Sequence, residues 1–265
     1  MDNKIFAIDV NSLADSAVFA RYLEKQRPER RDQVNRMKFD TGKRLSLGAG
    51  IVTERALEYA GCTGAEIIIT PEGKPTVKGC EFNLSHTENI AICAVSERPV
   101  GIDIERPRQF SGSLIRKAFT PDEIQMVEGL MHTDLPAVLP KIPALMELCR
   151  NTNPIPYAAK DDSGKLSENA KSILPTDSMS DRIYTRLWTV KESVMKWFGL
   201  GLSLAPEHIQ VSVREDIRVM LIGEPKLSKQ AGKLRFTTYD HGEYRITVCS
   251  EQAAFSDKIE WIQLA

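Results

Sequence analysis

The sequence contains no long hydrophobic run and almost no imbalance of charge. Its longest unbroken apolar stretch is Ile90–Val95, far short of the roughly 20 residues that cross a bilayer. The amino terminus lacks the apolar core of a signal peptide, because Asp9 interrupts it. The 265 residues carry 35 Lys+Arg and 36 Asp+Glu, a net charge of −1. We therefore predict a cytoplasmic protein with neither a membrane nor a nucleic acid as its partner.

Cysteine is also scarce, and no two cysteines have the C-x-x-C spacing of a zinc ribbon or a redox site. Cys93 and Cys249 fall within apolar, strand-like runs, where a reduced cysteine acts as a small core residue. Hydrophobic residues make up 42% of the chain and charged residues 27%, the balance of an ordinary globular protein. A chain of this length can bury one large core or two smaller ones. The five cysteines are Cys62, Cys80, Cys93, Cys149 and Cys249.

Two similar sets of elements are predicted along the chain. Residues 82–97 and 236–251, aligned without gaps, match at Phe, Ile, Ser and Glu and share an apolar run. This predicts an α/β (α+β) fold of two similar subdomains related by a pseudo-twofold axis, with the active site in the cleft between them. The first set comprises a helix over 45–59, a buried strand over 66–70 and strands over 82–84, 90–96 and 100–105. The second comprises a helix over 188–198, strands over 208–213 and 217–222, and a hairpin over 234–239 and 244–250.

These halves are expected to cover residues 1–105 and 106–265. Between their motifs lies a proline-rich insertion near 130–181. Residues 136–175 hold six of the 14 prolines, and much of this stretch is polar and aperiodic, which is typical of a loop. Pro143–Cys149 is predicted as one short helix within it.

The motif VGIDIE at Val100–Glu105 is the first candidate for chemistry. On a strand, Gly101, Asp103 and Glu105 share one face, and the three aliphatic residues face the other way. Two carboxylates on one face repel each other unless a cation lies between them, and a hard divalent ion prefers such oxygen ligands. The alternative is a solvent-facing strand with two acids that bind nothing.

A second candidate is WTVKESVMK at 188–196. On a helix Trp188, Glu192 and Lys196 lie on one face. A Glu followed by a Lys four positions later is also an ordinary surface pair. We expect Trp188 to be buried, so that this face points into the protein. Glu192 is then a metal ligand or a general base, and Lys196 a cation for a phosphate.

Three further features point to an anionic ligand. FNLSH places Ser85 and His86 at a strand end, where they can contact a phosphate oxygen. Lys74 and Pro75 place a cation on a rigid turn. A histidine at a strand end and such a turn are each common in proteins. Residues 21–44 hold nine basic and four acidic residues, which is typical either of a solvated helical face or of an anion site.

Together, and in this order, the GKP turn, FNLSH, VGIDIE and WTVKESVMK strongly resemble the 4′-phosphopantetheinyl transferase superfamily, Sfp type. The resemblance implies transfer of the phosphopantetheine arm of coenzyme A to a serine of an apo carrier protein, with release of 3′,5′-ADP. Its partners would be acyl carrier proteins or the carrier domains of fatty-acid, polyketide or peptide synthetases. The implied enzyme is Mg²⁺-dependent, with Mn²⁺ as an alternative ion, and works as a monomer.

The same resemblance assigns roles to residues. The implied metal ligands are Asp103, Glu105 and Glu192, and Glu192 with Lys196 would be catalytic. The implied contacts to coenzyme A are Arg30, Arg44, Ser46, Lys74, Pro75, Ser85, His86, Asp103 and Lys196.

The chain departs from the family at two places. Gln33 stands where a lysine often occurs. Asp103 and Lys191 are 88 positions apart, more than the family usually has, which we attribute to the insertion. The insertion is either passive or lies beside the carrier surface and affects partner choice. Two other readings of the whole chain are a coenzyme A or carrier-binding module without turnover, and a metal-dependent phosphoesterase.

Overall fold

The structure is a computed structural model that describes residues 1–133, 145, 178–251 and 255–264. Within these residues helices and strands mix along the chain, as the sequence predicted. The predicted insertion lies almost wholly outside the described residues, and so does all of its predicted helix except Leu145. In the part of the chain that is described, no helix is long and apolar enough to cross a membrane.

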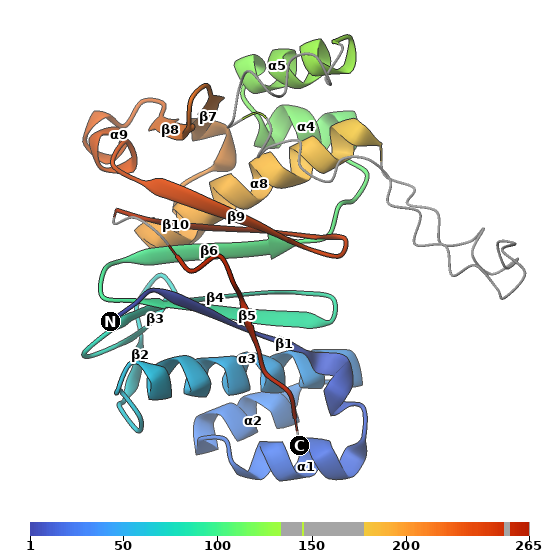
Figure 1. The fold of residues 1–265 in the computed structure, drawn as a ribbon, viewed down its shortest axis with the longest axis vertical. Helices are drawn as coiled ribbons and strands as arrows, with labels where there is room; N and C mark the ends of the chain where they lie inside the picture. Colours follow the sequence, from blue (N-terminus) through green and yellow to red (C-terminus); the bar gives the residue numbers. More distant parts are fainter. Residues whose placement is uncertain (134–144, 146–177, 252–254, 265) are drawn as a thin grey trace, which may run out of the picture.

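One sheet contains four strands in the order β11-β1-β5-β4. β5 is antiparallel to both β1 and β4, and β11 runs parallel to β1. Helix α3 covers one face of this sheet, with α1 and α2 beyond it (Figure 1). The bounds are β1 Lys4–Asp9, β4 Glu81–Thr87, β5 Ile90–Ser96, β11 Glu260–Trp261, α1 Ser16–Glu24, α2 Pro28–Arg36 and α3 Asp40–Tyr59.

A second sheet contains three antiparallel strands in the order β6-β10-β9, and helix α8 covers its outer face (Figure 1). The layers therefore run α3, first sheet, second sheet, α8. Alternate apolar residues from both sheets meet between them in one buried cluster. The bounds are β6 Val100–Glu105, β9 Arg235–His241, β10 Tyr244–Ser250 and α8 Met179–Phe198.

The two sheets also meet along β4 and β6, although no backbone ladder joins these strands. The Asn83 side chain accepts a hydrogen bond from the Ile102 amide at 3.0 Å, and the Ser85 hydroxyl accepts one from the Ile104 amide at 3.3 Å. Side chains of β4 thus satisfy backbone donors of β6. This junction fixes Ser85 beside the acidic motif of β6.

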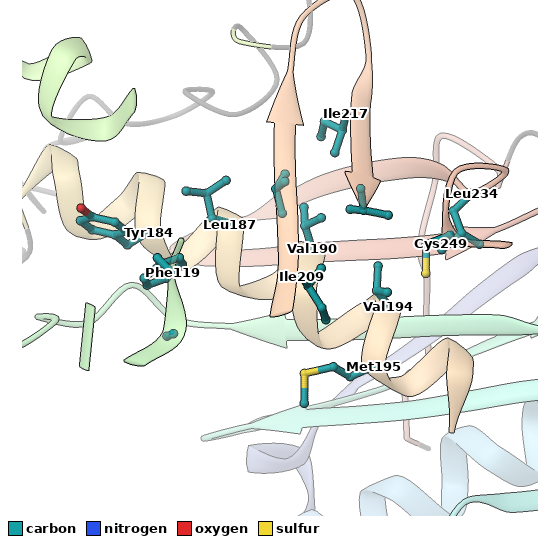
Figure 2. Close-up of a cluster of buried hydrophobic side chains, with 14 of the residues drawn as sticks. Phe119, Tyr184, Leu187, Val190, Val194, Met195, Ile209, Ile217, Leu234 and Cys249 are labelled. Carbon is teal, nitrogen blue, oxygen red and sulfur yellow. The ribbon is translucent and has the colours of Figure 1, made fainter. Parts of the chain in front are cut away.

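Helix α8 packs against β6 and β10 on one side and against α5 and β7 on the other. Its buried apolar residues, among them Leu187, Val190 and Val194, contact the hairpin β7–β8 (Figure 2). Gly101 allows the close approach to β6, since a Cβ there would lie 1.9 Å from the Ser193 carbonyl oxygen. The remaining bounds are α4 Gly112–Ala118, α5 Pro121–Met131, β7 Ile209–Val213, β8 Ile217–Leu221 and α9 Pro225–Ala231.

Most predicted elements are confirmed, with longer helices: α3 begins at Asp40 and α8 at Met179. The prediction of a buried strand over 66–70 is wrong. Strand β2, Ile67–Ile69, pairs with β3, Pro75–Val77, in a two-stranded hairpin, and the Ile68 and Ile69 side chains are 59% and 61% exposed. A run of isoleucines favours a strand whether or not other elements cover it. The pseudo-twofold relation and the division at residue 105 stay predictions.

Candidate active site

The acidic residues of β6 lie where the alternation of the strand predicts. Asp103 and Glu105 share the face with Gly101, which α8 covers, whereas the aliphatic residues between them enter the cluster between the sheets. Asp103 is 3% exposed. A carboxylate buried to this extent requires compensating partners.

Those partners come from β4 and α8. The Ser85 hydroxyl donates to Asp103 Oδ1 at 2.9 Å, and the Lys196 ammonium donates to the same oxygen at 2.6 Å. Lys196 also donates to the Ser85 hydroxyl oxygen at 2.9 Å. Three distant segments of sequence therefore meet at one point, as the resemblance implied for these residues. The other carboxylate oxygen, Asp103 Oδ2, is buried and has no hydrogen-bond partner among the described residues.

Glu105 has a strongly perturbed carboxyl group. Burial and the negative charge of Asp103 raise its pKa to about 7, although Arg108, a hydrogen bond from Trp188 and the charge of Lys196 act in the opposite direction. At neutral pH this carboxyl is balanced between its protonated and ionised forms. A positive ligand nearby would favour ionisation.

Glu192 has the same kind of environment on α8. Burial and the charge of Asp103 raise its pKa, and Lys196 partly opposes the increase. Each glutamate thus lies within the electrostatic field of Asp103. The sequence prediction of a buried Trp188 is wrong in degree, because Trp188 is half-buried, like Glu192 and Lys196. This face of α8 therefore borders solvent beside β6 rather than the core.

The acids have the chemistry of a metal site without its closed geometry. Among the described residues no three His, Cys, Asp or Glu side chains are grouped so that they could hold a metal ion. The unpartnered Asp103 Oδ2 and the two glutamates with raised pKa values nevertheless fit an oxygen-ligated cation. The residue types fit the predicted ion, and the metal ligation itself stays a prediction.

His86 lies next to Ser85 but is exposed on the other face of β4. Partial desolvation and the positive charges of Lys196 and Arg30 lower its pKa, whereas Asp103 raises it. The structure therefore places His86 in the electrostatic neighbourhood of both Asp103 and Arg30. Arg30 donates to the Gln33 side chain at 3.0 Å. Gln33, which stands where the family often has a lysine, therefore contacts the arginine that is predicted to bind a phosphate.

The GKP turn lies at the carboxy-terminal end of α8. The Lys74 ammonium donates to the Trp197 carbonyl oxygen at 3.2 Å, and burial lowers the pKa of Lys74. Gly199 ends α8 with φ +66°, and a Cβ there would lie 2.8 Å from the Lys74 side chain. Pro75 begins the second strand of the hairpin.

Arg44 and Ser46 lie on the first turns of α3. Arg44 Nε and Ser46 Oγ are both buried, and neither has a hydrogen-bond partner in the part of the chain that the structure describes. Unpartnered polar atoms of this kind are costly unless a ligand or water satisfies them. Their state agrees with the predicted anion contact, which remains a prediction.

The sequence analysis missed Glu123. This side chain and that of Lys191 are both fully buried and form an ion pair at 2.6 Å. Lys191 also donates to the carbonyl oxygens of Ala118 at 2.8 Å and Pro206 at 3.0 Å. The sequence T-P-D-E at 120–123 is a capping-box pattern, and Glu123 does accept from the Thr120 amide. That signal could have located Glu123, though not its partner.

Comparison with known proteins shows which family this chain is similar to. Residues 165–249 match the family model described as the 4′-phosphopantetheinyl transferase superfamily. A 4′-phosphopantetheinyl transferase of Bacillus subtilis is 24% identical over 264 residues, which cover 97% of this chain and 96% of the relative. The transferase Sfp of Bacillus subtilis (strain 168) is 24% identical over 267 residues, 98% of this chain and 97% of Sfp. The transferase HetI of Nostoc sp. is 34% identical over 182 residues, 64% of this chain and 57% of HetI.

The resemblance carried by the four motifs is therefore confirmed: residues 165–249 match the model of the 4′-phosphopantetheinyl transferase superfamily, and the chain is similar to Sfp-type transferases over nearly its full length.

Proposed function

We propose that this protein transfers the 4′-phosphopantetheine arm of coenzyme A to a serine of an apo carrier protein and releases 3′,5′-ADP. The observation that carries the proposal is the meeting of Ser85, Asp103 and Lys196 at one point, with two further acids in the same electrostatic field. A cationic side chain beside clustered carboxylates suits attack on a pyrophosphate. The similarity to named transferases supports the same activity.

Asp103, Glu105 and Glu192 would hold a divalent cation, Mg²⁺ or Mn²⁺. When bound, the ion would neutralise the pyrophosphate and hold its oxygens in place. The protein supplies the oxygen ligands, and the buried Asp103 Oδ2 is the oxygen with a free position for it. The raised pKa values of the two glutamates mean that a cation would lower both as it binds.

Other predicted residues would position coenzyme A. Lys74 and Pro75 form the turn on the adenine side, at the end of α8. The phosphates would be contacted from β4 and from the basic segment of α2 and α3. The residues that we assign to these phosphate contacts are Ser85, His86, Arg30, Arg44 and Ser46.

In the transfer itself, the serine oxygen of the carrier bonds to the phosphorus that bears the pantetheine arm. The bond from that phosphorus to the bridging oxygen breaks, and 3′,5′-ADP leaves with the electron pair. Glu192 would accept the serine proton directly or through a water. Lys196 stabilises the charge that develops on the leaving group.

The test is to incubate the protein with coenzyme A, Mg²⁺ and a panel of apo carrier proteins, and to weigh each carrier by mass spectrometry. We expect one carrier or more to gain a single phosphopantetheine arm. EDTA and Glu192→Gln should each abolish the gain. Coenzyme A binding without transfer to any carrier would favour a binding module, and release of 3′,5′-ADP without a carrier would favour a phosphoesterase.

We further propose that the enzyme is a cytoplasmic monomer of two similar halves, residues 1–105 and 106–265. The insertion near 130–181 would lie beside the carrier and affect the choice among fatty-acid, polyketide and peptide-synthetase carriers. Deletion of residues 136–175 tests this assignment. Unchanged kinetics toward every carrier would show that the insertion is passive.

A further inference from the structure

Lys196 and Asp103 form an unusually uneven ion pair. Their atoms Nζ and Oδ1 are 2.6 Å apart, but the side chains are 27% and 5% exposed, respectively. The ammonium therefore lies nearer to solvent than the carboxylate, which is almost wholly buried. Through this pair and the Ser85 hydroxyl, the protein supplies the positive charge that a buried carboxylate requires.

The pair satisfies only part of the carboxylate. Lys196 and Ser85 both bind Oδ1, whereas Oδ2 is buried and no described residue forms a hydrogen bond with it. A divalent cation at Oδ2 would lie beside the ammonium, and the two positive charges would repel each other. Lys196 in this position therefore opposes the metal that the three acids otherwise fit.

Lys196 has a flexible four-carbon stem, and its side chain is partly exposed. The side chain lies on the half-exposed face of α8. Its ammonium could exchange the Asp103 carboxylate for another anion and still form an ion pair. The pyrophosphate of coenzyme A is such an anion. When it draws the ammonium away, Asp103 loses its counter-ion and becomes a stronger ligand for a divalent cation.

We propose that Lys196 is an internal counter-ion that competes with the metal for Asp103 until the pyrophosphate draws it away. This inference rests on the proposed function, and it adds a regulation of the same site. Metal and substrate are then coupled through one lysine, and each tightens the binding of the other by the same factor. Without substrate, Lys196 neutralises Asp103. When the substrate binds, Asp103 becomes available to the metal.

The experiment is a calorimetric titration of the full chain with Mg²⁺, without and with coenzyme A, with no carrier present. The heat of titrating Mg²⁺ into coenzyme A without protein is subtracted. In Lys196→Met we expect metal affinity without coenzyme A to rise about tenfold over wild type, and the further gain from coenzyme A to shrink. A role of Lys196 confined to the substrate phosphates predicts no such rise. An affinity equal to or below that of wild type overturns the proposal.

Lys74→Met is the matched control, because Lys74 is a half-buried lysine near the same helix end that donates to a carbonyl instead of a carboxylate. Its metal affinity without coenzyme A should not change. Should Lys196→Met fail to fold, as judged by circular dichroism, Lys196→Gln replaces it with the same expected rise. The outcome is separate from transfer activity. If wild type loads carriers but the Mg²⁺ affinity of the variant does not rise, only the counter-ion role is rejected. If the Mg²⁺ affinity rises but wild type loads no carrier, only the proposed function is rejected.

Discussion

Two lysines on α8, five positions apart in the sequence, have opposite surroundings. Lys191 is fully buried, and its ammonium is held by Glu123 and two carbonyl oxygens from different elements. Lys196 is partly exposed and contacts a carboxylate that has one oxygen without a partner. The first ion pair is complete, and the second leaves a ligand position available.

The difference predicts that one side of α8 contributes to stability and the other to the proposed reaction. The side of α8 that bears Lys191 joins α4, α5 and β7, since Glu123 also accepts from the Val211 amide at 2.7 Å. The side that bears Lys196 points toward the acids of β6. Substitutions on the first side should change the free energy of unfolding, and those on the second should change the reaction.

The largest effect is expected from Glu192→Gln, on the chemical side. Loss of the proposed general base should lower the rate about 10²–10⁴-fold, and the unfolding free energy should not decrease, because burial disfavours the charged form of Glu192. Single-turnover transfer to a carrier and urea unfolding measure the two quantities. Glu128→Gln, an exposed glutamate of α5, is the control. A variant that unfolds easily and reacts at the normal rate would contradict the division between the two sides.

Lys191→Met tests the buried side. It leaves the Glu123 carboxylate buried without its cation, which should cost about 3–5 kcal/mol of unfolding free energy. The double variant Lys191→Met/Glu123→Gln removes that charge and keeps an amide oxygen as an acceptor, so it should recover part of the loss. Urea unfolding of both variants gives the comparison. A single variant as stable as wild type would show that the pair contributes nothing.

Gly101→Ala disturbs both sides together, because it separates α8 from β6. A Cβ at this position would lie 1.9 Å from the Ser193 carbonyl oxygen and 2.7 Å from the Trp197 amide nitrogen. Backbone atoms cannot move aside as a flexible side chain can, so we expect a loss of about 3 kcal/mol and slower transfer. Gly129→Ala on α5 has no atom within 4 Å of the new Cβ and should stabilise by about 0.5–1 kcal/mol. Equal effects of the two changes would contradict the close contact.

The sequence predicted the parts of this arrangement that depend on local patterns. The alternation of Val100–Glu105 placed Asp103 and Glu105 on one face, and the helical spacing placed Glu192 and Lys196 together. The exposure of β2 was not predictable, because a three-residue apolar run has the same pattern whether or not another element covers it.

Long-range pairing was the other limit. The ion pair between Glu123 and Lys191 joins residues from two separate helices, and nothing in the spacing of either residue names its partner. The order of the motifs predicted that Lys196 and Asp103 belong to one site, but it did not predict that they contact each other. The unpartnered Asp103 Oδ2 could not be predicted, because it depends on which oxygen Ser85 and Lys196 share.

The smallest effect is a pH dependence on the chemical side. The pKa of Glu105 is about 7 in the folded protein against 4.5 for an unperturbed glutamate. Between these two values the folded state binds more protons than the unfolded state, so this group lowers stability as pH rises from 4.5 to 7, and no further above that. Since Glu105 is only half-buried, solvent screening limits the loss to about 1–2 kcal/mol.

Glu105→Gln isolates that contribution, because glutamine resembles the protonated acid at every pH. In EDTA, urea unfolding at pH 5 and pH 8 should show the variant gaining stability relative to wild type as pH rises. Glu128→Gln, at an exposed position of α5, is the control for the removal of one negative charge. A constant difference between Glu105→Gln and wild type would mean that Glu105 titrates normally. The field of Asp103 would then be fully compensated by Lys196, and the chemical side would resemble the buried side more than its geometry indicates.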